Sequence, residues 1–311
     1  MKKNSGIVLF FLLFSLLISV SACTTSNVTP SDNSKMNVVA TTSIVADIVA
    51  NVGGDRINLS TLVPLNVDVH SFEPTPRDLV SIEDAEIIFI NGGGLEAFID
   101  RMIESTNSSE KTINVSDGVT FRHLTDEHEQ VSINSENTDP HTWTDPNNVM
   151  IWVKNIEQAL SKMDPDHSDY YAANAKEYLQ QLQDLDQWIQ AESAQIPVEN
   201  RKLITDHLML GYFADRYDYQ IIGAVIPSYS TMSQPSAKEI SDLINLIQET
   251  GAKAILIGKS TNPAIAERIS QDANIKVALY YTGSLSTADE PASTYLDYMR
   301  ANVNAIIEAL Q

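Results

Sequence analysis

The stretch SDYYAANAKEYLQQLQDLDQWIQAESAQ, residues 168–195, contains no proline or glycine. Its apolar residues recur at intervals of three and four, which places them on one face of a helix. They are Tyr171, Ala175, Tyr178, Leu182, Leu185 and Ile189. At 1.5 Å per residue, a helix of this length spans roughly 40 Å, more than most helices in globular proteins. Pro197 ends the pattern, so the stretch predicts a stiff helix between two separately built parts.

On both sides of this stretch, short β-branched runs alternate with helical patterns. The expected strands are 38–42, 57–63, 86–90 and 112–115 before it, and 202–205, 219–226, 254–257 and 276–280 after it. Such alternation implies parallel sheets built from βαβ units. We therefore expect an α/β protein with two Rossmann-like βα lobes, joined by one long rigid helix and separated by a cleft. The expected boundaries are 37–165 for the N-terminal lobe, 166–197 for the bridging helix and 198–311 for the C-terminal lobe.

The N-terminus carries an export pattern. Two lysines precede the apolar run Ile7–Val20, which is too short for a spanning helix. The sequence Val20-Ser21-Ala22-Cys23 resembles the bacterial lipobox, in which the cysteine is acylated. We expect residues 1–22 to be a lipoprotein signal peptide, Cys23 to be lipidated and residues 23–36 to be a flexible tether. The protein would then be exported and anchored to a bacterial cell membrane, on its outer face or periplasmic side; the alternative is a plain signal peptide with an incidental cysteine.

The charge balance restricts the partners. The chain has 20 Lys and Arg against 41 Asp and Glu, a formal net charge of −21. Nucleic acid and anionic lipid head groups would be repelled, whereas cations would be attracted. The chain has 1 cysteine, so it forms no internal disulfide and depends for its stability on burial alone or on burial together with a metal.

Three histidines stand far apart in the chain, each close to an aspartate. The segments are Asp68-Val69-His70, Asp139-Pro140-His141 and Asp206-His207. His70 follows the expected strand 57–63, and His207 follows the strand 202–205 at an expected helix start. Ligands of open α/β sheets bind outside the carboxyl ends of the strands, so the three imidazoles are expected to face one another across the cleft between the lobes. The aspartates either orient the imidazoles or cap turns and helices.

The segments around these histidines resemble a family. VHSFEPTPRD at residues 69–78 looks like the PHxxEPTPRD motif of the zinc- and manganese-type substrate-binding proteins of ABC importers. DPHTWTDP at 139–146 is similar to their DPHxWxDP segment, and GYFADRY at 211–217 to their GYFAxRY run. The long bridging helix matches as well, so the resemblance covers essentially the whole chain after the export signal.

The resemblance implies that His70, His141 and His207 ligate a metal ion in the cleft. It implies a function as well: capture of a divalent transition metal for an ABC permease and its ATPase, by a monomer that is not an enzyme. A histidine at the third position favours Zn²⁺, because manganese-type members carry a carboxylate there and Mn²⁺ prefers harder oxygen ligands. Mn²⁺ is the alternative cargo, and a surface adhesin role with the same fold stays open.

Two positions depart from the family pattern. Gly283 stands where many members have an aspartate ligand, and Lys259 replaces an acidic residue, so a cation is expected near the cleft. We expect three histidines plus water, or a substitute fourth ligand or supporting carboxylate from Glu73 or Asp289.

The sequence leaves two other hypotheses open, one for function and one for the segment before residue 146. Three ligands with an open position also suit a zinc hydrolase, although the chain has no His-Glu-x-x-His helix. Between Gly118 and Pro146 the periodic pattern lapses, which predicts a mobile surface loop. His123 and His128 lie there among carboxylates and form a weak candidate for collecting metal.

Overall fold

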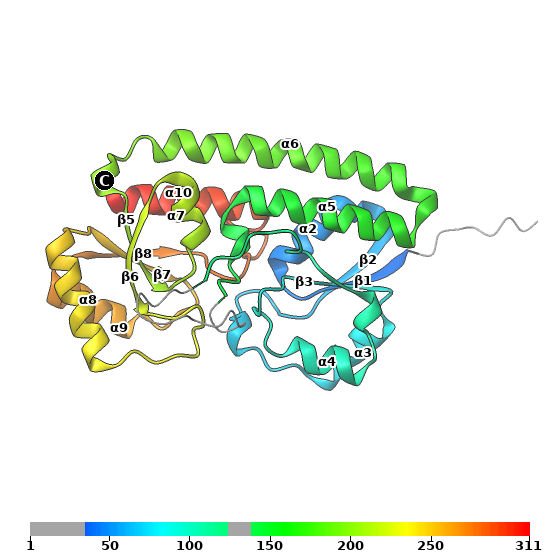
Figure 1. Cartoon of the computed structure of the whole chain (residues 1–311), viewed down its shortest axis with the longest axis horizontal. Coiled ribbons are helices and arrows are strands. Elements are labelled where there is room, and N and C mark those ends of the chain that lie inside the picture. The colour runs from blue at the N-terminus through cyan, green and yellow to red at the C-terminus, as the bar shows by residue number, and fades with distance from the viewer. Residues whose placement is uncertain (1–34, 124–137) are drawn as a thin grey trace, which may run out of the picture. The chain divides into compact units, whose positions relative to one another are not determined.

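The computed structural model describes residues 35–123 and 138–311 (Figure 1). The expected signal peptide at 1–22, the lipidation site Cys23, nearly all of the tether and His128 lie outside the described residues. Within the described ranges, no helix is both long enough and apolar enough to cross a membrane. Residues Lys35–Gln311 form one compact unit.

Two four-stranded parallel sheets organise this unit, as the alternating pattern predicts. The first has the order β2-β1-β3-β4 and the second the order β6-β5-β7-β8. The strands are β1 (Met36–Ala40), β2 (Ile57–Thr61), β3 (Ile87–Ile90), β4 (Thr112–Asn114), β5 (Lys202–His207), β6 (Gln220–Ile226), β7 (Ala254–Gly258) and β8 (Lys276–Tyr280). The central strands are almost continuously apolar because helices cover both faces of a parallel sheet; all five residues of β7 are buried.

Of the four helices around the first sheet, three begin at capping residues and α4 (Ile99–Ser105) does not. The other three are α2 (Ser43–Gly53), α3 (Pro76–Asp84) and α5 (Pro146–Met163). Thr75 and Asp78 form a capping box at the start of α3, and Asp145 caps α5 by accepting a hydrogen bond from the backbone N–H of Asn147. In both helices a proline occupies the first turn, where its missing N–H costs nothing. The proline-rich motifs of the sequence are thus helix starts.

The second sheet is flanked by α7 (Gly211–Tyr217), α8 (Ala237–Thr250), α9 (Ala264–Ala273) and α10 (Tyr295–Leu310). One large apolar cluster contains residues of both lobes, while a smaller cluster joins the second sheet to α8 and α9. The two lobes therefore share a continuous core rather than meeting at a polar seam.

The predicted long helix is α6 (Ser168–Ser193), which runs along both lobes (Figure 1). Its buried residues include all six apolar positions of the predicted face. It packs against α2 and α5 of the first lobe and against α7 and α10 beside the second. Near its C-terminal end, the buried carboxylate of Asp186 accepts hydrogen bonds from Arg216 at 2.6 and 3.0 Å and from Tyr217 at 2.9 Å. This ion pair ties α6 to α7.

The structure corrects one expected boundary. His207 is the last residue of β5 and pairs with Ile226 of β6, so it does not start a helix; α7 begins at Gly211.

Between β3 and α4, the chain turns through Gly92, Gly93 and Gly94, all with positive φ. A side chain at Gly92 would also collide with Asn114, whose Oδ1 lies 2.0 Å from the position of a Cβ.

Candidate metal centre

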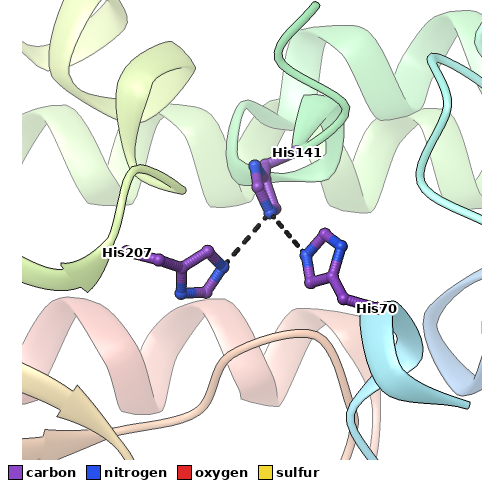
Figure 2. A group of neighbouring side chains, drawn as sticks. All are labelled: His70, His141 and His207. Carbon is purple, nitrogen blue, oxygen red and sulfur yellow. Dashed lines mark hydrogen bonds between the residues drawn. The ribbon is translucent and has the colours of Figure 1, made fainter. Parts of the chain in front are cut away.

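The three widely spaced histidines converge, with their Nε2 atoms facing one another (Figure 2). The Nε2 of His141 lies 3.4 Å from that of His70 and 3.3 Å from that of His207. One ring nitrogen from each of the three lies within 4.8 Å of the other two. His141 and His207 are buried and His70 is half-buried. Two of them belong to the expected N-terminal lobe and one to the C-terminal lobe.

A short helical turn, Val69–Ser71, positions His70. Asp68 caps this turn, since its Oδ1 accepts a hydrogen bond from the backbone N–H of His70 at 3.1 Å. The other oxygen of Asp68 accepts a hydrogen bond of 2.5 Å from the hydroxyl of Thr231, which follows β6 of the second lobe. Asp68 therefore fixes the turn and links it across the cleft. Of its two expected roles, the structure supports capping.

His141 immediately precedes the turn Thr142–Thr144 and is held by Asp139. The Oδ1 of Asp139 accepts a hydrogen bond from the backbone N–H of His141 at 3.0 Å and lies 2.8 Å from its Nδ1. An Nδ1–H that donates to this carboxylate fixes the tautomer in which Nε2 carries a free lone pair. Asp139 thus orients the imidazole toward the cluster.

Asp206 holds His207 in the same way and is held more firmly itself. Its Oδ1 accepts a hydrogen bond from the backbone N–H of His207 at 2.8 Å and lies 2.9 Å from Nδ1. The hydroxyl of Tyr280 donates to the same oxygen at 3.0 Å. The backbone N–H of Gly258 and the hydroxyl of Thr261 donate to Oδ2, each at 2.9 Å. The carboxylate therefore joins the ends of β5, β7 and β8 directly behind the imidazole.

Burial disfavours protonation of two of the three histidines. Burial and the charge of neighbouring His207 lower the pKa of His70 to about 4, and burial lowers the pKa of His141 well below its usual value. Burial acts to raise the pKa of Asp206, but the charge and hydrogen bond of His207, with the hydrogen bonds from Gly258 and Thr261, outweigh it and lower that pKa to about 2. The site thus combines two imidazoles that resist protonation with a carboxylate that stays ionised. Lone pairs this close repel one another unless a cation lies between them.

A cavity of about 390 Å³ adjoins the cluster. All three histidines line it, together with Trp143, Thr282 and Gly283 among others. Trp143 is almost fully buried and donates a hydrogen bond from Nε1 to the hydroxyl of Tyr298 on α10 at 3.1 Å. Trp143 thus packs between the lobes, while one side of the cluster stays open to the cavity.

The structure does not bring the expected carboxylates to the cluster. Glu73 and Asp289 are exposed, and neither lines the cavity. Glu73 follows the turn of His70 in the proline-rich loop before α3, while Asp289 lies in the loop before α10. Within the described ranges, the His/Cys/Asp/Glu cluster consists of the three histidines alone. In this structure neither Glu73 nor Asp289 contacts the cluster, so their role as a fourth or supporting ligand stays a prediction.

The expectation for Lys259 needs correction. Its Nζ lies 4.1 Å from the ring centroid of Tyr281 and donates a hydrogen bond of 2.7 Å to the Tyr281 hydroxyl. That hydroxyl in turn donates to Glu290 at 3.1 Å. Lys259 does not line the cavity, so its charge is held by an aromatic ring and a nearby carboxylate instead of facing the histidines. His123 lies outside the cluster as well and forms an isolated bridge with Thr138.

Arg122 is a supporting residue that the sequence analysis missed. Its Nε lies 3.7 Å from the Oδ2 of Asp139, and its guanidinium forms an ion pair with Asp215 of α7. A Cβ at Gly211 would lie 2.5 Å from the Nε of Arg122 and 2.7 Å from the Oδ2 of Asp139, so the first residue of α7 must be small. No local pattern marks Arg122, because its partners lie 17 and 93 residues away in the sequence.

Comparison with known proteins identifies the family of this chain. Residues 38–309 match the model of the ZnuA family, described as the periplasmic component A of the zinc-uptake complex. The chain belongs to this family. Its members are the periplasmic metal-binding components of ABC metal importers, so the resemblance stated from the sequence motifs is confirmed.

Within the ZnuA family, named relatives span nearly the whole chain. The manganese-binding lipoprotein MntA of Halalkalibacterium halodurans is 28% identical over 97% of each chain. The manganese ABC transporter substrate-binding lipoprotein PsaA of Streptococcus pneumoniae serotype 4 is 31% identical, covering 100% of this chain and 99% of the relative. These names describe binding proteins, which favours metal capture over the zinc hydrolase alternative.

Solved structures support the same fold. A manganese-bound periplasmic metal-binding protein of Candidatus Liberibacter asiaticus has a TM-score of 0.78 at 26% identity, over 89% of this chain and 100% of that one. The periplasmic zinc-binding protein TroA of Treponema pallidum has a TM-score of 0.79 at 24% identity, over 89% and 99%. At that identity, TroA supports the two-lobed fold alone.

Proposed function

We propose that this protein captures a divalent transition-metal ion with His70, His141 and His207 and delivers it to an ABC importer. The observation that carries the proposal is the spacing of the three Nε2 atoms. Zn–N distances of 2.0–2.1 Å place two ligand nitrogens of a tetrahedral ion about 3.3 Å apart. The two measured separations in the cluster, 3.3 and 3.4 Å, correspond to that spacing. An ion would thus enter without a large movement of the side chains.

The carboxylates behind the imidazoles strengthen the capture. A ligating histidine whose other nitrogen donates to a carboxylate is a more basic ligand in a fixed orientation. Asp139 and Asp206 provide this for His141 and His207. The ionised carboxylate of Asp206 also offsets part of the charge of a divalent ion in a buried site, where an uncompensated charge is costly.

Delivery requires that the captured ion leave again. The two lobes share one apolar core and are braced by α6, so we expect release to involve local changes at the cleft rather than wide separation of the lobes. The hydrogen bond between Asp68 and Thr231 crosses the cleft next to His70, and we propose that it opens during release. Lipidation at Cys23 would anchor the protein to a bacterial cell membrane, on its outer face or periplasmic side, close to the permease that works with an ATPase.

Manganese is the cargo that the comparisons favour. The named relatives MntA and PsaA, which span nearly the whole chain, are described as manganese proteins. Zinc is the second candidate, and the donor set favours it. Three imidazoles without a carboxylate suit Zn²⁺ better than Mn²⁺, which prefers oxygen ligands. Most nitrogen sites bind Zn²⁺ more tightly than Mn²⁺, so affinity alone does not identify the cargo.

Two experiments test the proposal. Calorimetric titration of the metal-free protein should show one ion bound per chain, with strong loss of binding in His207→Ala. His167→Ala serves as the matched control, because His167 lies in the turn before α6 and outside the cluster. Equal binding by His207→Ala and the parent would refute the site.

The cargo is identified in cells. Disrupting the gene in its source organism and growing the cells under limitation of each metal in turn should reduce cellular manganese if manganese is imported, or cellular zinc if zinc is imported. No change in either metal would contradict the import function.

A further inference from the structure

The cluster offers a metal ion fewer ligands than transition metals take. It contains three imidazole nitrogens and, within the described ranges, no carboxylate or thiolate. Zn²⁺ takes at least four ligands and Mn²⁺ takes about six. At least one coordination position is therefore left to something other than these side chains.

The space beside the cluster is far larger than one water molecule needs. The cavity that the histidines line has a volume of about 390 Å³, whereas one water molecule occupies roughly 30 Å³ in the liquid. This volume falls within the range of small-molecule sites, about 300–1,000 Å³. The open position of the metal thus faces a chamber that accommodates an organic ligand.

The chemistry of the cavity wall indicates which ligand. Hydroxyl and amide groups of Gln234, Ser260, Thr261 and Asn262 line it. The side chains of Gln234 and Ser260 are exposed and make no hydrogen bond to other described residues, so they are available to a guest. The described lining residues include no lysine or arginine but do include Asp68, whose carboxylate already accepts hydrogen bonds from His70 and Thr231. The negative charge of a guest would therefore be met by the metal, and its remaining polar groups by the wall.

Gly283 keeps this chamber open. It lines the cavity, and a Cβ added there would lie 3.5 Å from Cγ1 of Val69, an ordinary contact. Its backbone is not in the left-handed region that only glycine adopts readily. A side chain at position 283 is thus tolerated by the fold and would occupy space beside the histidines.

We propose that the protein captures its metal as a complex with a small α-hydroxy or α-amino carboxylate, which occupies the cavity beside Gly283 and completes the coordination of the ion. Such ligands chelate a metal through the carboxylate and the α group together, and so fill adjacent positions of the ion. The three imidazoles bind the opposite face of the ion, and the polar wall contacts the rest of the ligand. This inference rests on the proposed metal site at the three histidines.

The test uses radiolabelled citrate, an α-hydroxy carboxylate, and the full-length protein in equilibrium dialysis. With Zn²⁺ present, the parent protein should retain one zinc and one citrate per chain. Without metal, it should retain no citrate. Gly283→Asp places a competing carboxylate in the cavity and should retain zinc while losing citrate. Gly283→Ala adds only a Cβ and should retain both, which makes it the matched control.

The outcomes separate this inference from the proposed function. Zinc retained without citrate by the parent protein overturns the inference and leaves the metal site standing. Retention of neither overturns the proposed function. If the parent protein retains citrate without metal, or the Gly283→Asp protein retains as much citrate as the parent, then citrate does not bind on the ion beside Gly283. Should Gly283→Asp fail to fold, the visible absorption of the Co²⁺-loaded parent protein decides: citrate should shift the bands, and an unchanged spectrum contradicts the inference.

Discussion

One carboxylate oxygen of Asp206 makes two contacts with the next residue, His207. This Oδ1 accepts a hydrogen bond from the backbone N–H of His207 and faces the Nδ1 of its imidazole. The same carboxylate collects donors from Tyr280, Gly258 and Thr261. One side chain therefore fixes both the backbone and the imidazole of a proposed ligand, and it fastens them to two neighbouring strands.

Asp206→Asn should weaken metal binding about 10- to 100-fold, the usual effect of removing a carboxylate behind a ligating histidine. The amide retains an acceptor but loses the charge that stabilises the metal-bound imidazole. Competition of the protein with a chromophoric chelator for Zn²⁺ measures the change. Asp242→Asn removes the same charge from an exposed pair on α8 and should leave the affinity unchanged. Equal affinities of the two variants would show that Asp206 does not support the site.

The contribution of His70 to the stability of the metal-free protein should fall as the pH drops from about 6.5 to about 4. The pKa of His70 is lowered to about 4 in the folded protein from its ordinary value of 6.5. Over this range the unfolded chain binds more protons at this residue than the folded chain, so the free energy of unfolding decreases with acidification. Urea unfolding at a series of pH values measures the decrease.

His70→Ala is the comparison for this pH series. Burial also raises the pKa of Asp139 to about 7, and this group titrates in both proteins, so the difference between them isolates the histidine. The variant should lose less stability than the parent over this range. Parallel pH profiles for the two proteins would contradict the lowered pKa.

Thr231→Val should speed metal release severalfold while changing the fold little. The substitution preserves the shape of the side chain but removes the hydrogen bond that joins Asp68 to the second lobe, worth about 1.5–3 kcal/mol when the acceptor is charged. Stopped-flow transfer of the metal to a chelator measures the release rate. Thr287→Val, at an exposed threonine that does not line the cavity, is the matched control. A release rate equal to the parent's would exclude this contact from the release step.

Asp186→Ala should destabilise the protein by about 2–4 kcal/mol, because it leaves Arg216 and Tyr217 without their shared acceptor where α6 meets α7. Asp184 lies one position before the buried Leu185, on the exposed side of the same helix. Asp184→Ala should therefore lower the free energy of unfolding by less than about 0.5 kcal/mol. Denaturant unfolding compares the two variants. Similar losses would mean that the α6–α7 ion pair does not brace the lobes.

Much of the fold follows from local patterns in the sequence. The buried face of α6 is visible as a three- and four-residue periodicity, and Thr75-Pro76 and Asp145-Pro146 mark helix starts that the structure contains. The three histidines were identified because each stands near an aspartate and two of them follow expected strands. Such signals lie within a few residues of one another, so one sequence suffices to detect them.

The surroundings of the site depend on contacts across the chain and escaped prediction. Lys259 was expected near the cleft as a charge that weakens metal binding; it adjoins the cavity-lining Ser260, but the ring and hydroxyl of Tyr281 hold its ammonium. His207 was expected to start a helix, but its pairing with Ile226 extends β5 through it. A carboxylate such as that of Glu73 can ligate a metal, but Glu73 lies in the loop after His70 and is exposed in this structure. For Lys259 and His207, a partner distant in sequence decides the position.

X-ray absorption at the zinc edge of the zinc-loaded protein tests the central claim most directly. The account predicts three imidazole nitrogens at about 2.0–2.1 Å, with the multiple-scattering pattern of histidine rings and one or two further light-atom ligands. In the Asp242→Asn control the spectrum should be unchanged, and in His207→Ala one imidazole contribution should disappear. A shell with fewer than three imidazoles in the parent protein, or one that His207→Ala leaves intact, would contradict the account.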